Sequence, residues 1–326
     1  SPTLRSFSID HIIYDTFMKK ENFKKFMDNI IQNLEKGEQH SSAHVYRSAR
    51  NAFCRFMEAK RSDSFQLNAE LLKGFETYLL EKQLRLNTVS TYMRMLRATY
   101  NRAVDKGAAR YVPNLFKGVY TGVQSKTKRA LPPEVMAKLM EEQTMKEHPE
   151  YKWFVLMFLL RGIPFIDLAH LRKCDFNGSM ITYHRHKTKK ELNVSIPDEA
   201  MNIIRRSLDT TSSPYLFPIL DGNIRNGKEA YKNYQSELRK FNYRLSTLSK
   251  ELGNGIKLSS YTARHTWATT AYHQKMPIGI ISCALGHSSI KVTEAYLKPF
   301  GNSELSEVNR MIISYVKGCL GSTVTW

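Results

Sequence analysis

The chain has 326 residues, too many for one small hydrophobic core, and this length predicts two domains. Its 49 lysines and arginines against 30 aspartates and glutamates give a formal net charge of +19, which favours a polyanionic partner. The longest apolar run, at 153–160, is too short to span a membrane, and four scattered cysteines without zinc-type spacing predict a reducing cytoplasm and no structural metal.

Residues 8–107 follow a helical pattern with three polar breaks, which predicts four helices. In the first, apolar side chains recur at i, i+3, i+4, i+7, i+8 and i+11 from Phe23 and form one stripe. We expect the third helix to follow Asn68 and the fourth to end at Gly107. This part of the chain is therefore predicted to be an all-helical domain.

Two of these helices carry arginines on their polar faces. Arg47 and Arg50 lie on the second, and Arg94 and Arg97 lie on the fourth, close to small hydroxylated residues. Such a combination suits contacts with phosphate groups, so we predict that these four arginines bind nucleic acid. The alternative, an ordinary solvated helix face, stays open for each of them.

The second half of the chain begins after a Gly-rich, basic stretch at 117–130, which we expect to be a linker. A helix with prolines in its first turn should follow, and then a long apolar helix over 151–161. The stretches "MITYHRH" and "ELNVSIP" predict short strands joined by a lysine-rich turn, before helices return. Residues 131–326 are thus predicted to be mainly α with a small antiparallel β-sheet.

The segment 259–298 contains the residue types that a phosphodiester transesterification requires. An oxygen nucleophile must attack phosphorus in line, cationic donors must hold the non-bridging oxygens, and an acid must protonate the leaving alkoxide. Arginine offers a planar fork of donors, lysine or histidine can act as the acid, and tyrosine can form a reversible phosphate ester. Arg264, His287 and Tyr296 follow one another here.

In order and spacing, "ARHTWAT", "LGHSS" and "TEAYL" resemble the C-terminal signature of the tyrosine recombinase (phage integrase) family. That signature is an arginine-bearing helix, an LGH turn and a tyrosine about nine residues further on. Residues 8–107 look like the family's helical core-binding domain, so the resemblance covers nearly the whole chain. It implies a SAM-like core-binding domain at 1–116 and an α+β catalytic domain at 131–326, which together form a clamp on DNA.

The resemblance also implies roles for individual residues. Arg264 would clamp the scissile phosphate, His287 would hydrogen-bond the phosphate or the transition state, and Tyr296 would attack phosphorus to leave a 3′-phosphotyrosyl enzyme. Lys187 in "HRHKTKK" would protonate the 5′-hydroxyl leaving group, although two further lysines of that turn compete for the role. The energy stays in the ester, so no ATP, metal or other cofactor is implied.

The chain departs from the family pattern at two positions. Tyr261 stands where the family has a histidine, and its role is open between a phosphate contact and a packed aromatic, since a phenol is a poor proton shuttle at neutral pH. In "RGIPFIDLAHL", Pro164 stands where the family has its first arginine. Because i and i+3 share a helix face, we expect Arg161 to fill that role, with Asp167 as the supporting acidic residue.

The resemblance implies a bacterial, cytoplasmic, nucleoid-associated recombinase that integrates, excises or inverts a mobile element. Its partners would be double-stranded recombination sites and three further copies of the chain, through a Holliday junction, with accessory DNA-bending proteins as optional partners and no membrane. A catalytically impaired DNA-binding protein on this scaffold and a type IB topoisomerase remain alternatives. The apolar spacing at 304–316 fits docking on a neighbouring subunit or packing on its own domain. Whether an arm-binding domain precedes Ser1 stays open.

Overall fold

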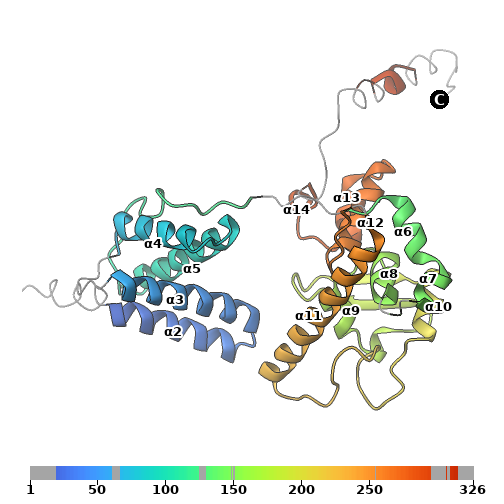
Figure 1. Cartoon of the computed structure of the whole chain (residues 1–326), viewed down its shortest axis with the longest axis horizontal. Helices are drawn as coiled ribbons and strands as arrows, with labels where there is room; N and C mark the ends of the chain where they lie inside the picture. The colour runs from blue at the N-terminus through green and yellow to red at the C-terminus, as the bar shows by residue number, and fades with distance from the viewer. Residues whose placement is uncertain are drawn as a thin grey trace, which may run out of the picture. The chain divides into compact units, whose positions relative to one another are not determined.

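The computed structural model describes residues 20–60, 67–124, 130–147, 149, 151–253, 255–294, 306 and 309–314. The chain divides into two compact units (Figure 1). One comprises Ser1–Lys126 with Ile224–Lys232, and the other comprises Thr127–Asn223 with Asn233–Trp326. The boundary at Lys126 falls within the stretch that we expected to link two domains.

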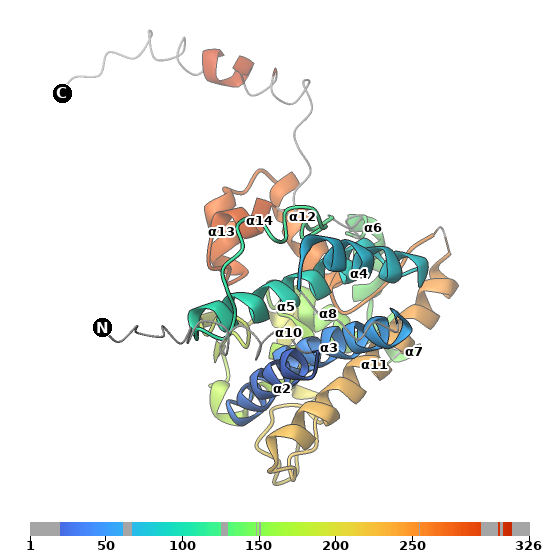
Figure 2. The ribbon, with the colours of Figure 1, turned by 90° about the vertical axis from the view of Figure 1, so that its left-hand side faces the viewer.

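The first unit contains the four helices that the apolar periodicity predicts. They are α2 (Lys20–Lys36), α3 (His40–Lys60), α4 (Ala69–Glu81) and α5 (Leu86–Asp105). Helices α2 and α3 lie side by side as a hairpin (Figure 2). In the core, Phe53 meets Phe23 and Phe75 edge to face, with ring centroids 5.4 and 5.1 Å apart.

Local signals set the ends of these helices as expected. The Asn68 side chain accepts a hydrogen bond from the Leu71 N–H at 2.8 Å and so caps the start of α4. Gly107 adopts a left-handed conformation (φ +67°), which lets the chain turn away after α5 and lets the Ala108 N–H reach the Ala103 carbonyl at 2.8 Å.

The first half of the stretch that we expected to be a linker, 117–130, is packed against the first unit instead. Val119 is buried in the core of the first unit. The buried Glu76 carboxylate accepts the Tyr120 N–H at 2.6 Å. The Asn87 side chain exchanges hydrogen bonds of 2.8 and 3.0 Å with the Gln124 backbone. Because these side chains satisfy backbone groups that a free linker leaves to water, the first unit extends past residue 116.

The second unit is mainly helical with one small sheet. Its helices are α6 (Pro133–Met140), α7 (Glu142–Glu147), α8 (Tyr151–Leu159), α9 (Phe165–His170), α10 (Asp198–Arg205), most of α11 (Gly227–Leu252), α12 (Thr262–His273), α13 (Ile278–Ala284) and α14 (Ile290–Glu294), with a 3-10 turn at Lys173–Asp175. Helix α8 supplies the centre of its core, where the Phe154 and Leu156 side chains are fully buried. The fold class predicted from the sequence is thus confirmed.

The sheet pairs β1 (Met180–His184) with β2 (Glu191–Ser195) in antiparallel register, from Met180 opposite Ser195 to His184 opposite Glu191. The two strands and the turn between them confirm the predicted hairpin. None of the helices in the described ranges has the length and hydrophobicity needed to cross a lipid bilayer.

The predicted helix over 151–161 is wrong at its C-terminal end. Helix α8 stops at Leu159, and both Arg161 (φ +59°) and Gly162 (φ +67°) are left-handed, so the chain turns sharply. Pro164 then occupies the N-cap position of α9, without a side-chain capping hydrogen bond. Arg161 and Pro164 therefore do not share the helix face on which the expected role of Arg161 rests.

Candidate active site

Arg264 lies in the first turn of α12 and is only 3% exposed. Its Nη1 donates to the Gly162 carbonyl at 2.8 Å, and its Nη2 donates to the Leu285 carbonyl at 2.6 Å. An added Cβ at position 162 would lie 3.0 Å from the Arg264 Cα, and Gly162 is left-handed, so a side chain there would press against the Arg264 backbone and strain its own. Backbone carbonyls from two loops thus fix the guanidinium in one orientation.

The LGH turn is the C-terminal cap of α13. Gly286 is left-handed (φ +65°), and the His287 N–H donates to the Ser282 carbonyl at 3.1 Å, the pattern of a glycine-terminated helix. This explains the glycine in the motif: it ends the helix and turns the next residue inward. His287 is accordingly only 8% exposed.

His287 contacts Arg264 directly. Its Nε2 lies 2.9 Å from Arg264 Nη2, and its Nδ1 lies 2.8 Å from Thr293 Oγ1 on α14. Because arginine can only donate, Nε2 accepts, and the ring proton belongs on Nδ1, where it is donated to the hydroxyl. Burial, and then the Arg264 cation, lowers the pKa of His287 to about 4. The imidazole is therefore neutral at physiological pH.

Tyr296 lies outside the described residues, which end in this region at Glu294. The Thr293 hydroxyl that contacts His287 is three residues before it in the sequence. The hydrogen bond thus ties the LGH turn to the helix that leads toward the expected nucleophile.

Lys187 occupies the exposed turn between β1 and β2, beside the LGH turn. Thr188 Oγ1 donates to the Gly286 carbonyl at 3.3 Å. The charge of Lys187 contributes to the low pKa of His287, whereas the charge of Lys189 acts on the pKa of His186. Among the lysines of this turn, Lys187 is the one whose charge acts on the pKa of His287.

Asp167 lies on α9 and forms a buried ion pair that sequence reasoning missed. Its Oδ2 is 3.1 Å from Arg185 Nη1, and its Oδ1 accepts the His186 N–H at 2.8 Å. Burial raises the pKa of Asp167, and the Arg185 cation opposes that rise. Arg185 could have been found from the strand alternation, because it follows Ile181 and Tyr183 on the buried face.

Tyr261 and Arg161 lie differently from the buried residues. Tyr261 is 61% exposed immediately before α12, so the packed-aromatic alternative does not fit. Arg161 lies in the turn after α8, where its Nη1 donates to the Asn193 carbonyl on β2 at 3.3 Å.

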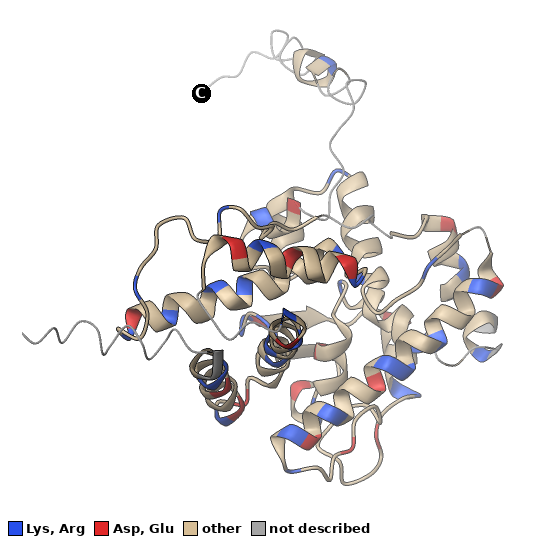
Figure 3. Cartoon of the chain, turned by 60° about the vertical axis from the view of Figure 1, so that its left-hand side comes forward, with Lys and Arg blue, Asp and Glu red and all other residues tan. Residues whose placement is uncertain are grey.

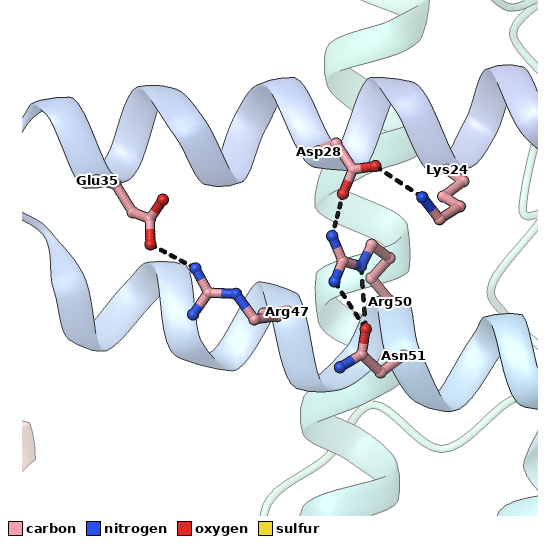
Figure 4. A network of polar contacts seen from close by, with 6 residues as sticks. All are labelled: Lys24, Asp28, Glu35, Arg47, Arg50 and Asn51. Atoms are coloured by element: carbon pink, nitrogen blue, oxygen red, sulfur yellow. Dashed lines mark hydrogen bonds and ion pairs between the residues drawn. The ribbon is translucent and has the colours of Figure 1, made fainter.

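The predicted DNA-binding arginines of α3 are engaged within the first unit. Arg47 pairs with Glu35 on α2 at 2.5 Å, and Arg50 pairs with Asp28 and Asn51 (Figure 4). These contacts brace α3 against α2. On α5, Arg94 is partly buried and Nη2 donates to Thr91 Oγ1 at 3.2 Å, whereas Arg97 is exposed. Lysines and arginines are spread over both units (Figure 3).

Two family models match this chain. Residues 22–117 match the phage integrase SAM-like domain, and residues 129–302 match the phage integrase family. The chain therefore belongs to the phage integrase family, the class of tyrosine recombinases, and its two structural units correspond to the two matched domains.

Similar proteins and structures agree with this assignment. Tyrosine recombinase XerA of Thermococcus onnurineus is 25% identical over 265 residues, covering 70% of this chain and 90% of XerA. XerA of Pyrococcus furiosus is 25% identical over 272 residues, covering 71% and 90%. The Tn1549 transposon integrase in complex with circular intermediate DNA has a TM-score of 0.59 at 17% identity, covering 90% of this chain and 99% of that one. A lambda integrase tetramer bound to a Holliday junction has a TM-score of 0.60 at 13% identity, covering 91% and 82%.

The structural likenesses confirm the fold, and the family match and recombinase relatives support a site-specific recombination enzyme. They do not favour the inactive scaffold or the topoisomerase alternative.

Proposed function

We propose that this chain cuts and rejoins DNA at specific sites through Tyr296, with Arg264, His287 and Lys187 as the groups that act on the scissile phosphate. The observation that carries the proposal is the buried contact of Arg264 with His287 at 2.9 Å. Both side chains are held by the same LGH turn, and the lysine-bearing hairpin contacts that turn at Gly286.

In the cleavage step, the Tyr296 oxygen attacks phosphorus and the bond from phosphorus to the 5′ oxygen breaks. Arg264 holds the non-bridging oxygens with its fork of donors. Lys187 gives a proton to the departing 5′ oxygen. One phosphoester replaces another, so the 5′-hydroxyl of a different strand can attack the phosphotyrosine and reverse the step without ATP.

The protonation state of His287 gives it a defined place in this step. Its neutral Nε2 is an acceptor in the free protein, so it can take the proton that Tyr296 loses. The imidazolium then becomes a donor to a phosphate oxygen. Exposed Tyr261 provides a further hydroxyl that can donate to the phosphate, while Asp167 supports the lysine hairpin through the His186 N–H.

The assembly that we propose is a tetramer, with two chains on each of two double-stranded sites and a Holliday junction between the exchanges. A lambda integrase of the same fold is a tetramer bound to a Holliday junction, which supports this proposal. Met311, Ile312 and Ile313 are 58%, 57% and 45% exposed on the helical residues 309–314, which gives an apolar surface for docking on a neighbouring subunit.

We propose that Arg94 and Arg97 of α5 contact DNA phosphates directly. Arg47 and Arg50 also contact phosphates, through the side of each guanidinium that faces away from its ion pair. The reaction integrates, excises or inverts a mobile element in the bacterial cytoplasm, on nucleoid DNA. Accessory DNA-bending proteins assist where the sites must be brought together.

A nicked duplex tests the catalytic proposal. The strand beyond the scissile phosphate is short, so it diffuses away after cleavage, and its loss traps the covalent adduct. The recognition sequence is first selected by the protein itself from a random pool of duplexes. We expect an adduct on a denaturing gel with the native chain and none with Tyr296→Phe, because phenylalanine lacks the phenolic oxygen that attacks phosphorus. Absence of an adduct with the native chain on a bound site would refute the proposal.

A further inference from the structure

Pro164 leaves the proposed phosphate site with one cation fewer than the family pattern. Its ring offers no side-chain donor, and it serves here as the residue that begins α9. In-line displacement at the phosphodiester leaves negative charge spread over the non-bridging oxygens in the transition state, so a second guanidinium beside Arg264 would stabilise it. Another cationic side chain near the LGH turn would restore that charge.

Arg185 lies against that turn. An added Cβ at Gly286 would lie 3.0 Å from Arg185 Cγ and 3.3 Å from Cδ, so the arginine stem runs beside the residue that precedes His287. Arg264 contacts the residues on both sides of Gly286, through the Leu285 carbonyl and the His287 ring. The two arginines therefore meet the same three-residue turn.

The donors of Arg185 are oriented but not used up by the protein. Asp167 lies 3.1 Å from Nη1, a charge contact without the angle of a hydrogen bond. Among the described residues, Nε and Nη1 have no hydrogen-bond acceptor, although both atoms are buried. Unsatisfied buried donors cost free energy, and an anion that accepts from them removes this cost. At 6% exposure, Arg185 is no more buried than Arg264.

Arg161 is placed less well for this role. Its Nη1 already donates to the Asn193 carbonyl on β2. All three arginines act on the pKa of Tyr183, but only Arg264 and Arg185 among them also act on the pKa of His287. The position of Arg161 after the end of α8 also removes the helical relation to Pro164.

We infer that Arg185, carried by the β-hairpin and oriented by Asp167, is the second arginine that binds the scissile phosphate in place of the family arginine missing at Pro164. This rests on the proposed function, since it assigns a further residue to the same site. One hairpin then carries both Arg185 for the phosphate oxygens and Lys187 for the leaving group.

Two substrates separate a phosphate-binding role from a merely structural one. Single-turnover cleavage is measured on the nicked duplex, and on the same duplex with a methylphosphonate at the scissile position, where a methyl group replaces one charged oxygen. On the phosphate, Arg185→Met should lose about 10²- to 10³-fold in rate. On the methylphosphonate, the variant and the native chain should differ by less than about 10-fold, because this substrate carries one negative charge fewer for an arginine to neutralise.

Two control variants accompany Arg185→Met: one at another position of the same hairpin, and one at the competing arginine. Glu191→Gln changes an exposed charge on β2 and should cleave both duplexes like the native chain. Arg161→Ala should stay within about 10-fold of native on the phosphate. If Arg185→Met fails to bind DNA or to unfold cooperatively, Arg185→Lys is used in its place. Lysine keeps the positive charge but lacks the planar fork of donors, so we expect a smaller loss of cleavage rate on the phosphate. This loss should also shrink on the methylphosphonate.

The outcomes are distinct. Near-native cleavage of the phosphate by Arg185→Met, or a defect of equal size on both duplexes, would overturn the assignment of Arg185 alone. So would a large phosphate-specific defect in Arg161→Ala without one in Arg185→Met. Failure of the native chain to cleave either duplex would instead refute the proposed function.

Discussion

At the scale of single residues, His287 connects catalysis to stability. Its ring is buried as a neutral imidazole with a pKa lowered to about 4, whereas an unfolded histidine titrates near 6.5. Between these two pH values the unfolded chain binds a proton that the folded chain does not. The stabilisation is therefore complete above pH 6.5 and is lost as the pH falls toward 4.

We expect the thermal midpoint of the native chain to fall as the pH is lowered from 7 to 4.5, with about 1–3 kcal/mol attributable to His287. Scanning calorimetry of the native chain and of His287→Gln measures this, and the variant should depend less steeply on pH. The pKa values of His170 and His186 are also lowered by burial, so some dependence should remain. Identical slopes for native and His287→Gln would contradict the assigned burial of a neutral imidazole.

At the scale of elements, Arg50 on the helix pair α2–α3 can be tested for two roles, bracing α3 against α2 and contacting DNA. Arg50 reaches Asp28 across the pair, with side chains 20% and 25% exposed, and Asp28 also contacts Lys24 at 3.1 Å (Figure 4). A partly buried ion pair of this kind contributes about 1 kcal/mol to stability.

Arg50→Met should therefore lower the free energy of unfolding by about 1 kcal/mol, and a cycle with Asp28→Asn should show coupling between the two sites. Urea denaturation of the full chain measures both quantities. The same proteins also test the DNA-contact prediction, through the dependence of DNA affinity on salt concentration. Loss of one phosphate contact reduces the slope of log affinity against log salt by about 1. Arg97→Met, on the exposed face of α5, should show that reduction. An unchanged slope in Arg50→Met would show that Arg50 braces α3 against α2 and does not contact a phosphate.

Elements with local signals could be predicted from the sequence. The apolar stripe from Phe23, the Asn68 cap, the Gly107 stop and the β-hairpin depend on residues close together in the chain, and the structure has all of them. The left-handed Arg161 could not be predicted, because only Gly162 after it signals such a conformation. The packing of residues 117–124 depends on Glu76 and Asn87, which are distant in sequence.

For the site, the ordered motifs implied that Arg264 and His287 act on one phosphate, and the structure places their side chains in contact. The backbone carbonyls that hold Arg264 could not be predicted from these motifs. Arg185 was missed because a basic residue in a lysine-rich turn is usually solvated, while the inward alternation of β1 buries it against Asp167. The structure thus adds a charged residue where the family pattern left a gap at Pro164.

At the scale of the whole molecule, two units with a combined net charge of +19 bring many cations to one polyanion. Such binding supplies affinity that is strongly salt dependent, but the same charge would serve any DNA-binding protein. What separates a recombinase from a DNA-binding scaffold is one covalent bond between the chain and one strand of its site.

The most direct measurement locates that bond. The adduct trapped on the nicked duplex is digested with protease and nuclease, and mass spectrometry identifies the modified peptide and the nucleotide attached to it. We expect a single phosphotyrosine at Tyr296, joined to the 3′ end of the cleaved strand, with a free 5′-hydroxyl on the released fragment. An adduct on any other residue, or a 5′ linkage, would contradict this expectation.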